Sequence, residues 1–308
     1  MKRFLKIVGI LALLFILLSL CYDKAIVWLI YNSPSNNTMK MAQIARGGDG
    51  ESLAIFGSSR ALSNYVPSLL SDSAFNYGVN GMSINEALRL LKLYLMANQS
   101  KSTIVINLDP WGFAKPGTEI LQGDYRLAGD IAAVREEFKD IDLGWLGMLP
   151  GVRFQGELRS ILGEYLNARK NVTKKIDNGA EILLKSRTDA EWDAIEARLS
   201  PIGFNFFNGN EKLLDEIYQL RGEHRIVWVV SPLSPAMRDK FTGGDALAQF
   251  LTYESTRDGV FSVSLIDWKD EFPRNMFVDV SHLNIWGAEK FSRAVRKEMD
   301  DMSEWGYK

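Results

Sequence analysis

The N-terminal part of the chain has a cationic flank followed by a long apolar run. Lys2, Arg3 and Lys6 precede apolar residues that continue from position 7 to position 22, broken by Ser19. A helix from position 4 to position 22 is about 28 Å long at ~1.5 Å per residue, close to the ~30 Å hydrocarbon core of a bilayer. We therefore expect residues 1–31 to form a single-pass membrane anchor.

A cleavable signal peptide is the alternative interpretation of this segment. Cleavage requires small residues before the cut, and residues 18–21 (LSLC) supply no A-x-A pattern. An uncleaved anchor is therefore favoured. The cationic flank predicts a cytoplasmic N-terminus, which places the rest of the chain on the outer side of the cytoplasmic (inner) membrane.

Beyond the anchor, apolar runs alternate with segments of helical periodicity. The apolar runs predict strands at residues 53–56, 74–77, 103–108, 224–230 and 263–267. Helical spacing predicts helices at residues 60–70, 84–96 and 285–299. Nearly continuous apolar strands between helices favour a parallel sheet covered on both faces. The expected fold class is α/β, a three-layer sandwich with a mostly parallel sheet.

Two stretches do not fit this alternation. Residues 32–50 are rich in Ser, Asn and Gly, which predicts a tether. Residues from about 115 to 222 contain helical runs at 155–172 and 188–199, which predict a helical insertion. The predicted organisation is thus an anchor, a tether, and an α/β domain over residues 51–308 that carries the insertion.

Composition narrows the classes of partner. The formal net charge is −2 and no block of Lys and Arg stands out, so nucleic acid is not an expected partner. Cys21 is the only cysteine and lies at the membrane end, so the external domain forms no internal disulfide. Two histidines without clustered ligand spacing, and no Walker or GxGxxG loop, predict neither a metal site nor a cofactor.

Ser59 is the leading candidate for a nucleophile. It lies in the block GSSR (57–60), at the turn between the first predicted strand and the helix after it. Reactive groups of parallel sheets collect beyond the carboxyl ends of the strands, which is where this turn lies. The alternative is that Ser58 or Ser59 only caps the following helix, as serine commonly does there.

His282 is the candidate base, and Asp279 the candidate group that orients it. A serine hydroxyl becomes a useful nucleophile when a base takes its proton and a carboxylate holds that base. The two residues lie three positions apart, before the last predicted helix. The alternative is a surface loop in which Asp279 caps that helix.

Four further residues are candidates for the oxyanion hole or for substrate binding. Gly78 follows the second strand and allows close backbone approach, so its N–H is a candidate oxyanion donor. The backbone N–H of Ser59 and the side-chain amide of Asn80 are the other candidate donors. Arg60 is a candidate for gripping an anionic group. Asp109, at the end of the third strand, is a candidate pocket residue. Each also has an ordinary interpretation, as turn chemistry or as a solvated side chain.

Taken together, these blocks resemble the SGNH (GDSL-type) hydrolase superfamily, with its flavodoxin-like sheet. The shared order is a Gly-x-Ser block after the first strand, a glycine block after the second, and Asp-x-x-His before the last helix. The blocks GSSR, NYGVNG (76–81) and DVSHLNIWG (279–287), with the N-terminal anchor, more closely resemble the branch of the teichoic-acid D-alanyl transfer protein and the exopolysaccharide O-acetylation proteins. The resemblance covers most of residues 53–117 and 224–299.

One departure concerns the family's Gly-x-Asn-Asp block. After its third strand this chain has LDPWG (108–112), so the asparagine that supplies a side-chain oxyanion donor is missing. Loss of one such donor typically costs ~10²–10³ in rate. Asn80 is the candidate to compensate.

The resemblance implies a membrane-anchored, extracytoplasmic serine esterase or acyltransferase that acts on envelope or exported polysaccharide through an acyl-enzyme. An integral-membrane O-acyltransferase is then the implied partner that supplies the acyl group. The alternative is a non-catalytic envelope or polysaccharide assembly protein that retains the fold. Sequence does not distinguish transfer from hydrolysis, because both pass through the same acyl-enzyme.

Overall fold

The computed structural model describes residues 1–31, 37–44, 46–98, 100–109, 136–137, 162–163, 166, 174–204, 211–264 and 271–304. The chain divides into two compact units, residues 1–42 with 121–170 and residues 43–120 with 171–308. The second unit holds the main sheet and every residue that the sequence singles out for chemistry.

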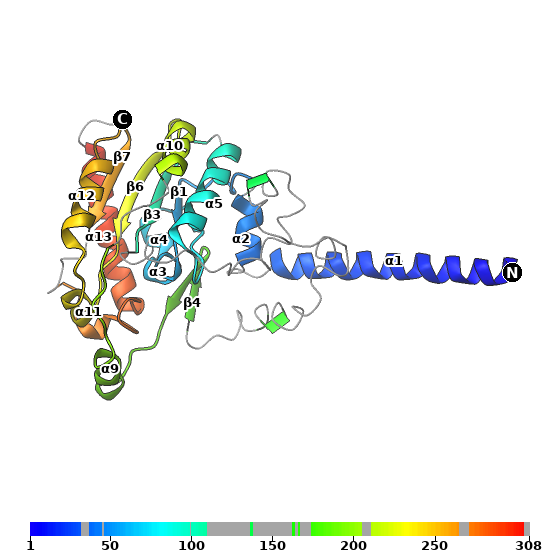
Figure 1. The fold of residues 1–308 in the computed structure, drawn as a ribbon, viewed down its shortest axis with the longest axis horizontal. Helices are drawn as coiled ribbons and strands as arrows, with labels where there is room; N and C mark the ends of the chain where they lie inside the picture. The colour runs from blue at the N-terminus through cyan, green and yellow to red at the C-terminus, as the bar shows by residue number, and fades with distance from the viewer. Residues whose placement is uncertain are drawn as a thin grey trace. The chain divides into compact units, whose positions relative to one another are not determined.

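Five strands of the second unit form one sheet in the order β2-β1-β3-β6-β7, and every neighbouring pair is parallel (Figure 1). They are β1 (Leu53–Phe56), β2 (Ala74–Asn76), β3 (Thr103–Asn107), β6 (Arg225–Val230) and β7 (Val260–Ser264). In this doubly wound order, ligands bind beyond the carboxyl ends of the strands, where the connections diverge between β1 and β3.

Helices cover both faces of this sheet. On one face lie α3 (Ser59–Asn64), α4 (Pro67–Leu70) and α13 (Ile285–Glu304). On the other lie α5 (Ile84–Ala97), α10 (Glu211–Leu220) and α12 (Gly244–Glu254). The predicted α/β class, a mostly parallel sheet between helical layers, is confirmed.

Alternation along β6 shows how the sequence divides these faces. Val227 and Val229 belong to the apolar core that includes Phe291 of α13. Trp228 points the other way, where its ring lies 5.2 Å from that of Phe250 on α12 and its Nε1–H donates to Tyr218 Oη of α10. Because both faces are buried, the strand is apolar at nearly every position.

The helix predicted at residues 60–70 is two helices in the structure. Pro67 has no backbone N–H, and a proline disfavours helical dihedrals in the residue before it. Val66 accordingly has φ −108° and ψ 92°, and Pro67 begins α4. The break ends α3 at Asn64, whose side chain contacts the loop at Ser281 and Leu283.

The predicted insertion is not helical throughout. Its described part includes β4 (Lys174–Asp177) and β5 (Ala180–Leu183), an antiparallel hairpin joined by Asn178 and Gly179. Both turn residues have positive φ, 42° and 82°, which suits a two-residue Asn-Gly hairpin turn. Helix α9 (Asp189–Glu196) agrees with the helical run at 188–199. The run at 155–172 lies outside the described residues, apart from three isolated positions.

Two smaller differences from the predicted elements remain. The last predicted strand is shifted, because β7 covers residues 260–264 and residues 265–270 are outside the described part. The predicted tether contains a helix, α2 (Asn37–Ile44), in which Met41 and Ile44 are buried. The remaining short helices are α11 (Pro235–Asp239) and the 3₁₀ turn η2 (Arg274–Met276).

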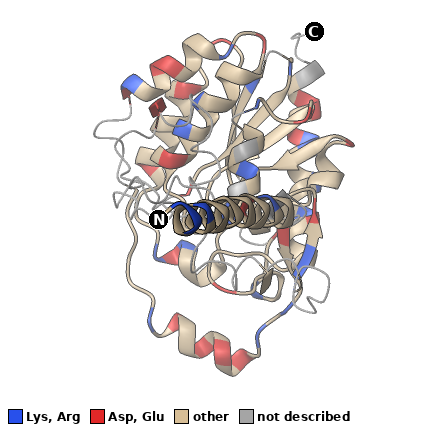
Figure 2. Ribbon diagram, turned by 90° about the vertical axis from the view of Figure 1, so that its right-hand side faces the viewer, with Lys and Arg blue, Asp and Glu red and all other residues tan. Residues whose placement is uncertain are grey.

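Helix α1 (Lys2–Tyr31) is long and apolar enough to cross a membrane, by its length and composition. Its segment Lys2–Leu29 has a mean hydropathy of 2.7 in its most apolar window. Cationic side chains mark its first turns (Figure 2), and uncharged residues follow from position 7 to position 22, before Asp23 and Lys24. The helix continues through the second apolar stretch, residues 25–31, without a break.

Candidate active site

Ser59 is the first residue of α3, directly beyond the end of β1. The chain leaves β1 through Gly57, whose φ is 143°. A Cβ at this position would lie 2.9 Å from both Ala61 Cβ and Asn107 O, so the turn requires glycine. The tight turn presents the half-buried Ser59 side chain at the carboxyl edge of the sheet.

His282 lies in the loop between η2 and α13, 223 residues after Ser59 in the chain. The fold brings the two side chains together, with His282 Nε2 at 2.8 Å from Ser59 Oγ. This distance lies within the range in which a histidine can take the proton of a hydroxyl group. The His282 side chain is 21% exposed, so the pair is reachable from outside.

Asp279 holds the other nitrogen of the same imidazole ring. His282 Nδ1 lies 2.8 Å from Asp279 Oδ2 and 3.0 Å from Oδ1. A carboxylate only accepts hydrogen bonds, so Nδ1 carries the proton and donates it. In the neutral ring Nε2 is then left to accept from the Ser59 hydroxyl, which is the tautomer that general-base catalysis needs.

The Asp279 carboxylate is ionised by its surroundings. Burial acts to raise its pKa, but the hydrogen bond and charge of His282, with the backbone N–H groups of Ser281 and His282, outweigh burial and lower the pKa to about 2. Both N–H groups donate to Oδ1, each at 2.9 Å. The carboxylate is therefore fixed in place and negatively charged at neutral pH.

Helix capping, the alternative role for these residues, is performed by their neighbours. Ser58 is the N-cap of α3, where its Oγ accepts from Arg60 N at 3.3 Å. At the start of α13, Asn284 Oδ1 accepts from Gly287 N at 3.1 Å. Ser59 and Asp279 are thus free of the capping roles that the sequence left open.

The structure corrects the prediction that Arg60 binds substrate. Its side chain is buried, 1% exposed, and its guanidinium pairs with Asp109 at 3.3 Å and donates to the carbonyls of Ser231 and Pro232. Burial lowers the pKa of Arg60, and the charge of Asp109 opposes that effect. A guanidinium committed to these internal partners does not reach an external anion.

Asp109 lies at the carboxyl edge of the sheet, but its carboxylate is turned inward. Besides the Arg60 pair, it accepts hydrogen bonds from Ser58 Oγ and from Asn107 Nδ2, the latter at 3.1 Å. Its side chain is 9% exposed. Asp109 therefore joins the nucleophile turn to the end of β3, and its predicted role in binding substrate is replaced by this internal one.

Gly78 is required for packing, and its N–H has another partner. That N–H donates to Asn76 Oδ1 at 2.8 Å, so the prediction that it holds the oxyanion is wrong in this arrangement. A Cβ at Gly78 would lie 2.6 Å from Leu62 N of α3, which no side chain tolerates. Asn80 is exposed in the turn after β2, and its role as a side-chain donor stays a prediction.

Sequence reasoning missed the polar residues that brace the histidine loop. Asn64, Ser231 and Ser281 are buried, and the Asn64 amide donates hydrogen bonds to the Ser231 hydroxyl and to the Ser281 carbonyl. A buried asparagine needs partners for its amide, but the sequence alone does not show that Asn64 is buried, so it carries no local signal for this role.

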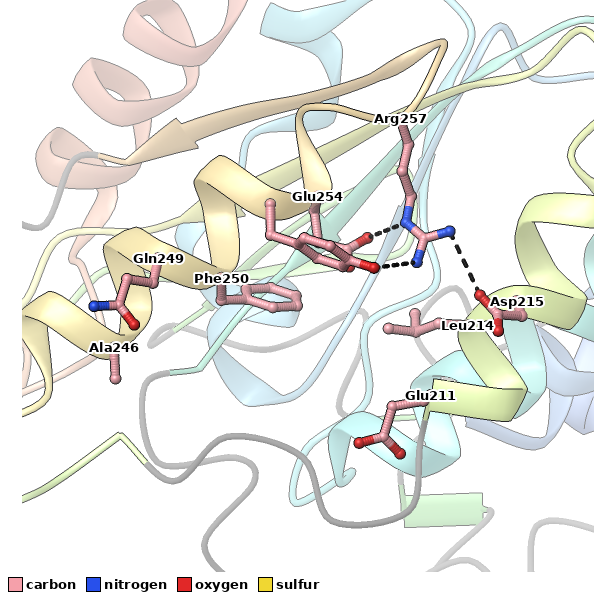
Figure 3. Close-up of a pocket in the computed structure, with 9 residues that line it drawn as sticks. Glu211, Leu214, Asp215, Ala246, Gln249, Phe250, Glu254 and Arg257 are labelled. Atoms are coloured by element: carbon pink, nitrogen blue, oxygen red, sulfur yellow. Dashed lines mark hydrogen bonds and ion pairs between the residues drawn. The ribbon is translucent and has the colours of Figure 1, made fainter.

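A separate cavity of about 460 Å³ lies elsewhere in the second unit (Figure 3). It lies beside α10 and α12, and Arg257 extends across it to form ion pairs with Glu254 and Asp215. None of Ser59, His282 and Asp279 lines this cavity. Among the described residues, no group of three or more His, Cys, Asp or Glu side chains is placed to hold a metal ion.

No family model matches the chain, and no curated protein matches it. Among solved structures, one similar protein is described as a "putative platelet activating factor" from Streptococcus pneumoniae. It is 14% identical, with 88% of this chain and 94% of that chain covered, and the TM-score is 0.35. So loose a likeness carries no argument about the site, which rests on its own geometry.

Proposed function

We propose that the protein is a membrane-anchored serine esterase or acyltransferase that acts through an acyl-enzyme. The observation that carries this proposal is the hydrogen-bonded chain from Ser59 Oγ through the His282 ring to the Asp279 carboxylate. A hydroxyl, a base and a group that orients the base together activate a serine for attack on an acyl carbonyl.

In the first half of the reaction, Ser59 Oγ attacks the carbonyl carbon of an ester while its proton passes to His282 Nε2. The tetrahedral intermediate then collapses, and the imidazolium returns the proton to the departing alcohol. Asp279 stabilises the imidazolium through Nδ1 and does not itself take the proton. The product of this half-reaction is an acyl ester of Ser59.

In the second half, water or a sugar hydroxyl gives its proton to His282 Nε2 and attacks the acyl carbon. The proton then passes to Ser59 Oγ as the acyl group leaves. With water the reaction is ester hydrolysis, and with a sugar hydroxyl it is transfer. The residues that do the chemistry are the same in both cases.

The oxyanion is held by the N–H of Ser59 and by the Asn80 amide in this proposal. The Gly78 N–H donates to Asn76, so fewer donors remain to stabilise the oxyanion. Donors placed where charge develops in the transition state accelerate the reaction because they need no rearrangement as it proceeds.

Asn80→Ala is therefore expected to lower kcat by ~10²-fold or more, with a much smaller effect on KM. The measurement is steady-state hydrolysis of an aryl acetate by the full chain in detergent. Asn98→Ala, a change at a buried asparagine after α5, is the matched control and leaves kcat unchanged. An Asn80→Ala enzyme with the kcat of the original chain contradicts the assignment.

Envelope or exported polysaccharide is the proposed substrate class, and an integral-membrane O-acyltransferase the proposed source of the acyl group. This part rests on the resemblance of the GSSR, NYGVNG and DVSHLNIWG blocks to polysaccharide acylation proteins. The apolar helix α1 agrees with an enzyme that works at a membrane.

The proposed location is the outer side of the cytoplasmic membrane, with α1 as an uncleaved anchor. A C-terminal alkaline phosphatase fusion is expected to be active and to sediment with membranes, because the cationic flank keeps the N-terminus inside. Fractionation and immunoblotting measure both properties. An active fusion recovered as a shortened soluble product identifies a cleaved signal instead, and an inactive fusion reverses the orientation.

Covalent labelling of the full chain by a fluorophosphonate tests the proposed activity. The probe reacts with a serine hydroxyl only when a base activates it. A chain that is folded but unlabelled favours the non-catalytic assembly role.

A further inference from the structure

The side chain of Asn64 is fully buried at the end of α3, five residues after Ser59 on the same helix. Its amide makes three hydrogen bonds. Nδ2 donates to Ser281 O and to Ser231 Oγ, both at 3.2 Å, and Oδ1 accepts from Leu283 N at 2.9 Å. Both the NH₂ group and the oxygen of the amide are thus hydrogen-bonded.

The partners of Asn64 in the loop lie on either side of His282. One is the carbonyl of the preceding residue and the other is the N–H of the following residue. The two backbone groups of His282 are fixed as well, since its N–H donates to Asp279 Oδ1 and its carbonyl accepts from Val278 N at 2.8 Å. The backbone around the base is therefore held from both directions.

From this geometry we propose that Asn64 is a positioning residue that sets His282 against Ser59. It does so because α3 carries the nucleophile at its first residue and the amide that holds the base loop at its last. A shift of α3 thus moves both groups together, and the 2.8 Å contact between them is preserved. The inference rests on the proposed function, because it concerns the same site.

The Asn64 amide supplies both the donor and the acceptor that the backbone of the loop requires. Alanine removes both contacts and leaves the Ser281 carbonyl and the Leu283 N–H without a protein partner in a buried place. Ser231, at the carboxyl end of β6, is the third anchor, and its hydroxyl holds the same amide from the side of the sheet. Ser231→Ala therefore loosens the amide without removing it.

Asn64→Ala in the full chain is expected to slow fluorophosphonate labelling by about 10²-fold, since displacement of a reacting group by ~1 Å costs that much. In aryl ester hydrolysis the loss falls on kcat, with little change in KM. Ser231→Ala is expected to show the same effect in weaker form. Asn98→Ala is the matched control for a buried asparagine, because it lies away from the loop and leaves the labelling rate unchanged.

A second measurement separates positioning from general loss of stability. The chain has two histidines, so ¹⁵N-histidine labelling gives two sets of ring signals, which His282→Ala assigns. In Asn64→Ala the ring signals of His282 are expected to shift or broaden, while those of His224 stay in place. If labelling and the His282 signals match the original chain, and only the unfolding temperature falls, the proposal is overturned.

The two proposals fail in different ways. If the original chain is not labelled at all, the proposed activity fails, yet the ring signals still report whether Asn64 holds the loop. If the original chain is labelled and Asn64→Ala is labelled at the same rate, the activity stands and the positioning role of Asn64 is rejected.

Discussion

Ser59→Ala is expected to abolish labelling by a fluorophosphonate and to reduce ester hydrolysis to the background rate. The reason is that Ser59 Oγ is the hydroxyl that lies 2.8 Å from His282 Nε2, so its removal takes away the attacking atom. In a hydrolase with this kind of triad, loss of the nucleophile costs about 10⁶ in kcat. Labelling followed by peptide mapping measures the effect and identifies the modified residue.

Ser58→Ala is the neighbouring control. Ser58 caps α3 and donates to Asp109, so the change is expected to destabilise the fold by ~1 kcal/mol while labelling persists. Thermal unfolding of both variants shows that loss of labelling in Ser59→Ala is not loss of structure. An inactive Ser58→Ala enzyme beside an active Ser59→Ala enzyme would show that the wrong hydroxyl has been chosen.

Four of the five strands in the main sheet are predictable to within one residue at each end. Central strands of a parallel sheet are buried on both faces, which makes them short, nearly continuous apolar runs. Of the two edge strands, β2 is also matched by its predicted range, whereas β7 is not, since Ser262 and Ser264 interrupt its pattern. The break between α3 and α4 is also predictable from the sequence, because Pro67 disfavours helical backbone dihedrals in the residue before it.

The candidate site was predictable where a short block carries the chemistry. Asp279 and His282 lie three residues apart, so a single turn of chain brings their side chains together. The roles of Arg60 and Asp109 depend on a pairing between the ends of two different strands, which spacing along the chain does not specify. Asn64 was missed for the same reason, since its partners in the loop follow it by more than 200 residues.

Burial explains why the roles predicted for Arg60 and Asp109 differ from those in the structure. An arginine beside a serine nucleophile suggests a grip for an anion, and most arginines are solvated. Here the guanidinium is 1% exposed and is balanced by the Asp109 carboxylate inside the protein. The negative charge of Asp109, after β3, is thus balanced internally, which reduces its repulsion of a developing oxyanion.

The orientation of the Asp279 carboxylate leads to a sharp prediction for Asp279→Asn. Oδ1 accepts from two backbone N–H groups, at Ser281 and His282, and Oδ2 is the oxygen nearer to His282 Nδ1, at 2.8 Å against 3.0 Å for Oδ1. Backbone N–H groups only donate, so the asparagine must keep its oxygen on their side. Its NH₂ group then points at Nδ1, where it can only donate.

A donor at Nδ1 forces the His282 ring into the wrong tautomer. Nδ1 must accept, so the proton moves to Nε2, which then has no lone pair for the proton of Ser59. Asp279→Asn is therefore expected to lower kcat by about 10⁴ although the side chain has the same size and shape. Ring ¹⁵N shifts of His282 measure the tautomer, and hydrolysis of an aryl ester measures the rate.

Asp177→Asn, which makes the same change at a carboxylate bonded to Ser68, is the control and keeps both the rate and the tautomer. A fast Asp279→Asn enzyme, or one whose proton stays on Nδ1, shows that the carboxylate does not set the state of the base.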